Sequence, residues 1–169
     1  MGPPISSVAW SPEFVAQTLE VLPVARRDRN LVWLKPIHAA SLRVGLAPSA
    51  QPAATVLEVL RWYPLAPLIV HSTSWRHEEG RIVLTYIAVV TILAGLPADS
   101  LLELPIHHTH LARGGATSAP DPIAIEAVLE HALRHLSWLM HDDPAVTQAL
   151  DGWTEALAGF EPEPFRSLA

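Results

Sequence analysis

Residues 68–90 read LIVHSTSWRHEEGRIVLTYIAVV, and this stretch decides the fold class. Both halves are rich in β-branched and aromatic residues, which favour extended strands. Between them lies Glu79-Gly80, a pair suited to a tight turn because glycine readily adopts the positive φ that hairpin turns require. The stretch therefore predicts a long β-hairpin that turns at Glu79-Gly80.

A second hairpin is predicted nearer the start of the chain. Residues 22–37 (LPVARRDRNLVWLKPI) place turn-forming residues at positions 28–30 between two apolar runs. Before this hairpin, Ser11-Pro12-Glu13 has the order of a helix start, with a capping hydroxyl, a proline and then an acid. The alternative is an extended segment that runs into the hairpin. The apolar face of the predicted helix would hold Phe14, Val15, Thr18, Leu19 and Leu22.

The middle and the end of the chain predict further helices. Residues 53–62 form a short one that Pro64 stops, and a long one opens at Asp121-Pro122 and continues to residue 141. Between them, the chain is expected to return through turns and then a loop at residues 112–122. The apolar stripe of the long helix consists of Ile125, Val128, Leu129, Ala132, Leu133, Leu136, Leu139 and Met140.

Two details complete the helical prediction. Glu130 and Arg134 are four residues apart and would pair on the solvent side of the long helix. Asp143-Pro144 starts a further short helix, and residues 160–169 are expected to form an extended tail.

Composition limits the classes of function. The length of 169 residues predicts one domain over 1–169, with a core at about 12–141 and a helical extension and tail at 142–169. The formal net charge of the chain is −6. The acidic balance argues against nucleic-acid binding, and the absence of cysteine excludes disulfides and thiolate chemistry. Residues 82–96 are too short an apolar run for a membrane span, and residues 1–14 lack the pattern of a signal peptide, so we expect a cytoplasmic protein.

The order of elements, together with VLPVARRDRNLVWLKP (21–36) and WRHEEGRIVLTYIAVV (75–90), resembles the Nudix hydrolases over residues 19–141. The resemblance implies an α+β fold in which a mixed β-sheet is sandwiched between helices, here with a C-terminal helical extension. Members of the family carry the signature G-x5-E-x7-R-E-U-x-E-E-x-G-U, where U is a bulky aliphatic residue. Its glutamates hold the Mg²⁺ or Mn²⁺ ion that polarises a diphosphate.

The signature is degenerate in this chain. Within VGLAPSAQPAATVLEVLRWYPL (44–65), Glu58 takes the place of the first glutamate of the core of the signature. Arg61 and Trp62 replace the next two glutamates, and Pro64 replaces the glycine. Neither arginine nor tryptophan can ligate a hard cation. The resemblance therefore gives no catalytic residue, and metal-dependent hydrolysis is not expected.

Histidines supply the candidate metal ligands. His131 and His135 are four residues apart and lie on one side of the long helix, although the H-E-x-x-H motif is absent. The run HHTH supplies His107, His108 and His110, and two histidines of this run with His131 or His135 would complete a zinc site that keeps one open position. The alternative is that the run is a loop or strand end near a pocket.

Polar residues at one end of the hairpin of residues 68–90 suggest a ligand site. His71 and His77 bracket a polar patch that also contains Ser72, Ser74 and Arg76. The alternative interpretation is that this patch is a hairpin end with solvated side chains. Residues 26–29 contain three arginines that form either a phosphate clamp or a solvated turn. The candidate ligand-binding residues are His71, Arg76, His77, His108, His110 and Trp138.

Three hypotheses of function follow. The first is a Nudix-like domain that binds a small ligand, such as a nucleotide derivative, or a protein partner, without metal-dependent hydrolysis. The alternative is a hydrolase whose divalent metal is ligated by histidines. The third is a homodimeric interaction module that uses an exposed tryptophan surface.

Overall fold

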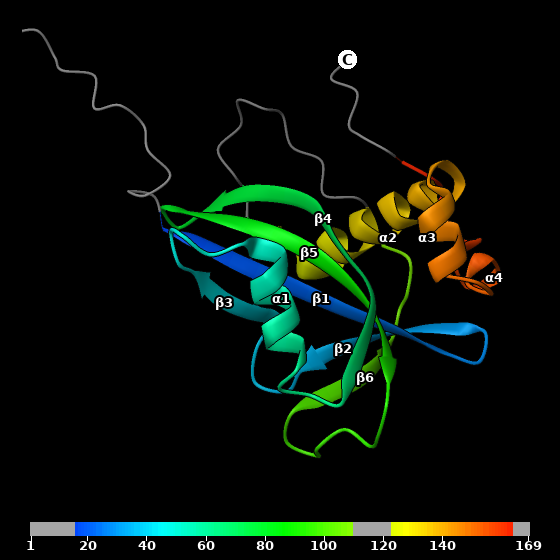
Figure 1. Cartoon of the computed structure of the whole chain (residues 1–169), viewed down its shortest axis with the longest axis horizontal. Helices are drawn as coiled ribbons and strands as arrows, with labels where there is room; N and C mark the ends of the chain where they lie inside the picture. The colour runs from blue at the N-terminus through cyan, green and yellow to red at the C-terminus, as the bar shows by residue number, and fades with distance from the viewer. Residues whose placement is uncertain (1–15, 110–122, 164–169) are drawn as a thin grey trace, which may run out of the picture.

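The computed structural model describes residues 16–109 and 123–163 and confirms the α+β class. A six-stranded sheet has the order β4-β5-β1-β2-β6, with β3 paired to β1 (Figure 1). The strands are β1 (Gln17–Arg27), β2 (Asn30–Pro36), β3 (Leu42–Leu46), β4 (Leu65–Glu78), β5 (Arg81–Ile92) and β6 (Leu101–Pro105). The helices are α1 (Pro52–Leu60), α2 (Ile125–Asp142), α3 (Pro144–Ala149) and α4 (Thr154–Leu157).

The β4–β5 hairpin is confirmed, including its turn. Glu79 and Gly80 have φ values of 49° and 76°, as a two-residue hairpin turn with positive φ at both positions requires. The β1–β2 hairpin is also confirmed, and Asp28 adopts a φ of 55° at its turn. Both turns therefore follow from local residue preferences.

The helix predicted from Ser11-Pro12-Glu13 is wrong within the described residues, because residues 17–22 belong to strand β1. Along one edge, β1 pairs with β5 in parallel. Along its other edge, β1 forms antiparallel pairs, first with β3 through residues 17–21 and then with β2 through residues 24–27. A strand covered on both faces has a nearly continuous apolar sequence, and such a run also contains residues at helical spacing. The alternative of an extended segment is therefore correct for these residues, and residues 11–15 lie outside the described part.

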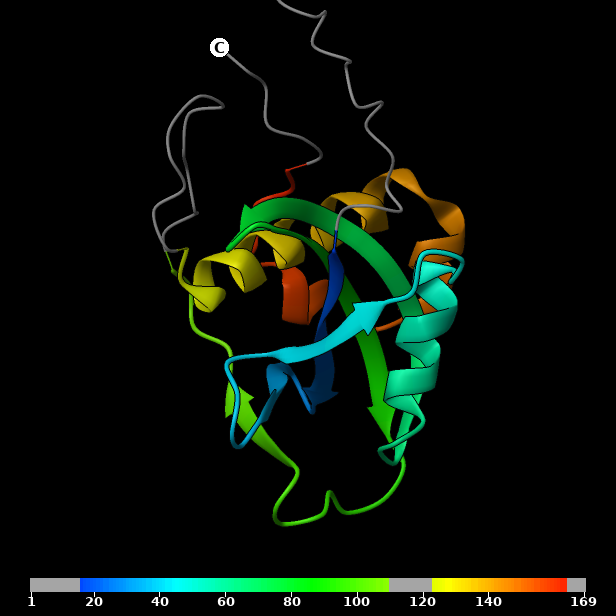
Figure 2. The ribbon, with the colours of Figure 1, turned by 90° about the vertical axis from the view of Figure 1, so that its left-hand side faces the viewer.

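The sheet is mixed, and a helix packs on each face of it (Figure 2). The α1 face is filled from β1, β2 and α1 by residues such as Leu19, Leu34 and Leu60. The α2 face contains Leu22, Trp33, Ile87 and most of the predicted stripe of α2. The buried residues that α2 contributes to this core are Val128, Leu129, Ala132, Leu133, Leu136 and Met140.

The C-terminal helices are part of the same core. Leu150, Trp153, Leu157 and Phe160 are buried in the cluster on the α2 face. α3 begins after the cap at Asp143, whose side chain accepts a hydrogen bond from the Ala145 backbone N–H, as the sequence predicts. The helical part of the extension therefore completes one side of the domain.

Strands β3 and β6 and the short helix α4 were not expected from the sequence. β3 and β6 have five residues each, and β6 follows a stretch rich in turn residues. Each is held by pairing to a longer strand, β3 to β1 and β6 to β2. Tertiary pairing stabilises such short strands, and their own residues give only a weak signal.

The predicted Glu130–Arg134 pair forms, with Arg134 Nε donating to Glu130 Oε1 at 3.1 Å. Its predicted place on the solvent side is wrong, because Glu130 is only 1% exposed. The segment after β6 covers this carboxylate, and the Thr109 backbone N–H donates to Glu130 Oε2 at 3.2 Å. None of the helices in the described residues combines the length and apolar character needed to cross a membrane.

Candidate functional site

A cavity of about 630 Å³ lies between β4 and α2. One wall comes from consecutive residues of the edge strand, and the other from α2 and the residues just before it. Apolar side chains, aromatic rings, hydroxyls and imidazoles all line it. The lining residues are His71, Ser72, Thr73, Ser74, Trp75, Arg76, Ile123, Ala127, Val128, His131, His135, Trp138 and Leu139.

A bulge in β4 explains how its polar residues reach one cavity. In a regular strand, His71 and Arg76 are five residues apart and would point to opposite faces of the sheet. The register with β5 shifts between Ser72 and Ser74, so His71 lies beside Ile87 and Arg76 lies beside Val83. Since residues 83 and 87 of β5 lie on the same face, the bulge places His71 and Arg76 together on the α2 face.

Two of the histidines meet across the cavity. The Nε2 atoms of His71 and His135 are 3.1 Å apart, and their ring centroids are 5.1 Å apart with an interplanar angle of 18°. At this separation one Nε2–H donates to the other Nε2, so the two imidazoles occupy complementary tautomers. The pair links the edge strand to α2.

The electrostatic setting of His71 favours its neutral form. Burial lowers the pKa of His71, and the neighbouring imidazole of His135 lowers it further. Asp143, at the start of α3, acts in the opposite direction. The balance leaves the pKa of His71 below its ordinary value, so near neutral pH the cavity contains an uncharged imidazole at this position.

Two tryptophans, Trp75 and Trp138, are among the residues that border the cavity. Trp138 lies one helical turn after His135, with a distance of 5.6 Å between the two ring centroids. Trp75 comes from β4 and is 66% exposed, which is unusual for so large an apolar side chain. The ring of Trp75 meets the ring of His77 edge to face, with 6.0 Å between the two ring centroids. The register with β5 places Trp75 beside Leu84, on the face of β4 away from α2, so Trp138 on α2 supplies the tryptophan ring on the cavity side of the sheet.

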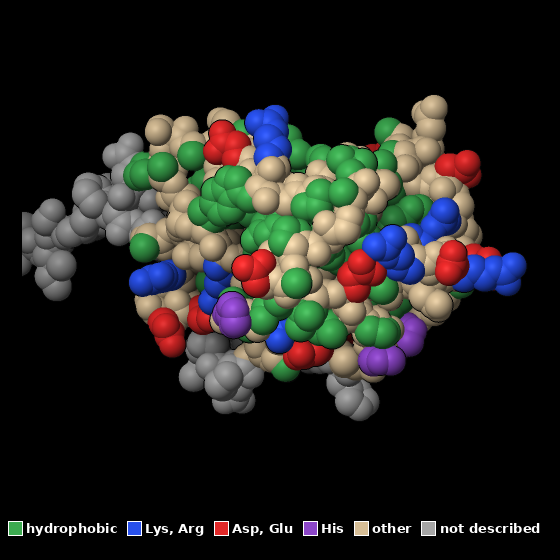
Figure 3. Space-filling view, turned by 90° about the horizontal axis from the view of Figure 1, so that it is seen from below, with side chains coloured by type: hydrophobic (Ala, Val, Ile, Leu, Met, Phe, Trp, Pro, Cys, Tyr) green, Lys and Arg blue, Asp and Glu red, His purple; other side chains and the backbone are tan. Residues whose placement is uncertain are grey.

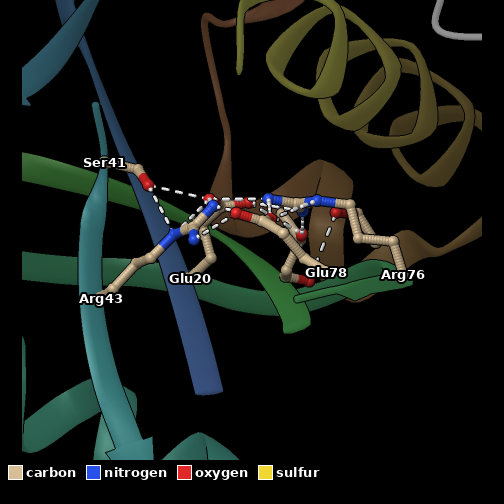
Figure 4. Close-up of polar contacts among 7 residues, drawn as sticks. Glu20, Ser41, Arg43, Arg76 and Glu78 are labelled. Carbon is tan, nitrogen blue, oxygen red and sulfur yellow. Dashed lines mark hydrogen bonds and ion pairs between the residues drawn. The ribbon is translucent and has the colours of Figure 1, made fainter. Parts of the chain in front are cut away.

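Arg76 joins the cavity to a buried ionic network that includes Glu20, Ser41, Arg43 and Glu78 (Figure 4). Glu20 lies in the middle of β1 and is fully buried. Arg76 Nη1 donates to Glu20 Oε2 at 2.7 Å, and Arg43 Nη2 donates to Glu20 Oε1 at 2.8 Å. The register of the sheet explains this meeting, because β1 pairs Glu20 with Arg43 on one side and with Thr85 on the other.

The network keeps Glu20 ionised despite its burial. Burial alone would raise the pKa of Glu20, but the hydrogen bonds and charge of Arg76, with hydrogen bonds from Ser41 and Arg43, hold this pKa below its usual value. Glu78 accepts hydrogen bonds from both arginines, and its pKa is lowered mainly by Arg43. Two carboxylates therefore balance two guanidinium groups, and Arg76 brings little net charge to the cavity.

The structure brings together some of the predicted site residues. His71, Arg76, His131, His135 and Trp138 all line the cavity. His77 lies outside it, beside Trp75, and His110 lies outside the described residues.

The histidines after β6 lie elsewhere. His107 is exposed, and His108 contacts Glu130, with 3.4 Å from its Nδ1 to Glu130 Oε1, and packs on the ring of Phe160. His108 therefore does not join the imidazoles that line the cavity. Across residues 16–109 and 123–163, no three or more histidines or acidic residues are grouped so that they could hold a metal ion.

The arginines at 26–29 do not form the phosphate clamp that was one of the two interpretations. Arg26 donates to the Gly152 carbonyl oxygen, Arg27 forms a double hydrogen bond to Glu103, and Arg29 lies 3.4 Å from Glu155. Each guanidinium is directed to a different protein acceptor. They tie the β1–β2 turn to β6 and to the C-terminal helices.

Sequence reasoning missed Glu20, which lies in the network behind the cavity, and it also missed the burial of Glu130. Glu20 interrupts the apolar run of β1, and an acid inside a strand covered on both faces signals a buried partner of opposite charge. Once residues 17–22 are assigned to a helix, this signal is lost. Glu130 gives no such signal in the sequence; its carboxylate meets His108 and Thr109 from the segment after β6 and Arg134 from its own helix.

Exposed apolar side chains bear on the hypothesis of an interaction module. Trp62 at the end of α1 is 70% exposed, and Leu93 after β5 and Leu102 in β6 are exposed too. Figure 3 shows hydrophobic side chains gathered between scattered charges on the side of the molecule where β2 and β6 lie.

The chain matches no protein-family model, and no curated protein matches it either.

Proposed function

We propose that this chain is a Nudix-like domain that binds a small, partly aromatic ligand in the cavity between β4 and α2, without metal-dependent hydrolysis. The observation that carries the proposal is the composition of the cavity wall. Apolar residues such as Val128 and Leu139 form much of it, while imidazoles, hydroxyls and Trp138 converge on the same space. Small-molecule sites combine these features: a mostly apolar wall and a few placed polar groups.

The size of the cavity agrees with this function. Pockets that hold small molecules and cofactors have volumes of roughly 300–1,000 Å³, and the cavity at about 630 Å³ is within this range. Trp138 supplies a face on which a flat ring can stack. A nucleoside or another heteroaromatic molecule fits this combination of size and surface.

The arrangement of the sheet supports the Nudix resemblance. The chain runs from three strands to α1, then through the long hairpin and β6 to α2, and a helix packs on each face of a mixed sheet. α1 lies in the segment where the degenerate signature was recognised. The resemblance therefore rests on the order of the elements and on that segment.

Residues at and after the end of α1 argue against the hydrolysis typical of the family. Glu58 is the one acid in α1, and its side chain is exposed. Arg61 and Trp62 follow it, are exposed as well, and offer no oxygen ligand to a metal ion. A single carboxylate does not make the site that a divalent ion needs to polarise a diphosphate.

A thermal-shift panel on chelator-treated protein tests this function. The panel contains nucleosides and nucleotides, each with and without Mg²⁺. A ligand at a hundred times its dissociation constant stabilises the fold by about 2.7 kcal/mol, which raises the midpoint by roughly 5–10 °C for a chain of this size. We expect at least one compound to give this shift without metal.

Two phenylalanine variants locate the binding. Ala127→Phe places a ring in the cavity wall and is expected to abolish the shift. Ala54→Phe adds the same ring to an exposed position of α1, on the other face of the sheet, and is expected to preserve it. If no compound shifts the midpoint, or if the shift survives Ala127→Phe, the proposed function is wrong.

A further inference from the structure

We propose that the ligand carries an anionic oxygen group, a carboxylate or a phosphate, and that its binding adds one proton to the His71–His135 pair. This inference rests on the proposed function, since it names the ligand class of the same cavity. It follows from three features: the signs of the ionisable groups in the wall, the balanced charge of Arg76, and the contact between the two imidazoles.

The wall of the cavity differs in charge from the chain as a whole. The sequence has 17 acidic against 11 basic residues, not counting histidine. Within the described residues, by contrast, the ionisable side chains that line the cavity are all nitrogen bases: His71, His131, His135 and Arg76. The hydroxyl group of Ser74, which pairs beside Thr85 on the α2 face, adds a further hydrogen-bond donor. Such a wall suits an anion better than a cation.

Arg76 does not supply the positive charge. Its guanidinium donates two hydrogen bonds to Glu20, one to Glu78 and one to Thr85. Four of its five N–H groups are directed to these acceptors, and its charge is balanced by the carboxylates. A positive charge for the ligand must therefore come from imidazole.

The contact between His71 and His135 limits the pair to one added proton. With an Nε2 to Nε2 distance of 3.1 Å, the neutral pair shares one N–H between the two Nε2 atoms. Adding a proton elsewhere on the pair produces an imidazolium beside an imidazole and keeps this hydrogen bond. A second added proton would place two positive charges in contact, which is strongly unfavourable.

The groups around the pair determine how easily the proton enters. β5 presents the non-titrating side chain of Ile87 beside His71, and α2 presents His131 to the same cavity. From α3, Asp143 favours the charged form of His71, while burial and His135 oppose it and lower its pKa. Arg76 remains balanced by Glu20 and Glu78. An anion in the cavity supplies the missing favourable charge and therefore promotes protonation.

This coupling makes affinity depend on pH. An anion binds the protonated pair better than the neutral pair, so its affinity rises as the pH falls. For complete coupling to one proton, the dissociation constant changes by about tenfold per pH unit above the pKa of the unliganded pair. An uncharged ligand of the same shape gains nothing from the proton and should show no such slope.

Calorimetric titration of the full chain with three naphthalene compounds tests the inference. The probes are 1-naphthoate, 1-naphthyl phosphate and the uncharged 1-naphthamide, measured at pH 6, 7 and 8. We expect the anions to bind more tightly than the amide, with naphthoate affinity falling at least tenfold from pH 6 to pH 8. Buffers of different ionisation enthalpy should reveal proton uptake with naphthoate and none with naphthamide. The two anions distinguish a carboxylate site from a phosphate site.

A glutamine variant isolates the pair. The double variant His71→Gln/His135→Gln keeps hydrogen-bonding side chains at both positions but cannot take up a proton there, so the pH dependence of naphthoate binding should become flat. His77→Gln makes the same change at an exposed position outside the cavity and should bind like the unmodified chain. If this double variant does not fold, NMR titration of the imidazoles in the unmodified chain replaces it, and naphthoate must then raise the titration midpoint of the pair.

Each result has a defined meaning. If naphthamide and naphthoate bind equally at every pH and Ala127→Phe abolishes both, the cavity binds ligands but the anion inference is overturned. If no probe binds, both the anion inference and this use of the cavity fail. If naphthoate binds with proton uptake that survives His71→Gln/His135→Gln, the assignment of the proton to the pair is wrong.

Discussion

Helices cover both faces of the sheet, but the two faces differ in chemistry. The α1 face is packed by aliphatic side chains from Leu19 to Leu101. The α2 face includes Glu20, Thr85 and His135, and the buried Glu130 lies on α2 itself. Apolar packing stabilises the first face, whereas the second combines a core with paired polar groups and a cavity. The comparison indicates that the α1 face maintains the fold and that the α2 face provides the site.

The largest expected effect concerns the buried ionic network. Glu20→Gln leaves Arg76 and Arg43 without their shared carboxylate, and removing one partner of a buried ion pair costs about 3–5 kcal/mol of unfolding free energy. Urea unfolding measures this loss. The control is Glu103→Gln, which removes the exposed partner of Arg27 and should destabilise the chain far less. Equal losses in the two variants would show that Glu20 is not the centre of the network.

Truncation on the α1 face sharpens the comparison. Leu60→Ala removes a fully buried side chain and should lower the free energy of unfolding by about 2–5 kcal/mol. Because Leu60 lies across the sheet from the cavity, ligand affinity should remain unchanged as long as the variant is folded. A large change in affinity at constant fold would contradict the division of roles between the two faces. Urea unfolding and calorimetry give the two readings.

Acid should affect the network in a definite direction. The pKa of Glu20 is lower in the folded chain than its ordinary value of 4.5, so its contribution to stability is complete above pH 4.5. That contribution is lost as the pH falls through the lower, folded pKa. Unfolding measured from pH 6 down to pH 3 should therefore show a decline that Glu20→Gln reduces. The same slope in both proteins would assign the acid sensitivity to other carboxylates.

The smallest effect is expected at the degenerate signature. Glu58→Gln changes an exposed helix residue and should alter the free energy of unfolding by less than about 0.5 kcal/mol. Neither this variant nor the unmodified chain should hydrolyse nucleoside diphosphate derivatives with Mg²⁺ or Mn²⁺. Phosphate release measured in parallel with a metal-free sample checks this. Hydrolysis that depends on both the metal and Glu58 would contradict the proposed binding function without metal-dependent hydrolysis.

Local signals predicted much of the fold. The turn residues at Glu79-Gly80 and the cap at Asp143 act within a few positions of themselves, and both were recognised. The first part of β1, residues 17–22, was assigned to a helix with an extended segment as the alternative, because its two buried faces remove the alternation that marks a strand. β3 and β6 escaped notice because pairing with distant strands stabilises them.

The site was less predictable than the fold. His71 and His135 were both candidates, but 64 positions separate them in the sequence and only the packing of α2 on β4 brings them together. The sequence instead suggested grouping His135 with the histidines at 107–110, which precede the long helix that contains His135. The bulge after Ser72 further changes which side chains face the cavity, and nothing in the residues around it marks its position.

Mapping 1-naphthoate binding by amide chemical shifts tests the central claim most directly, because it reads both faces of the sheet at once. The largest shifts should fall on residues 71–76 of β4 and 127–139 of α2, which line the cavity. The amides of α1 should change little. Shifts concentrated on α1, or spread evenly over both faces, would contradict the assignment of the site to the α2 face.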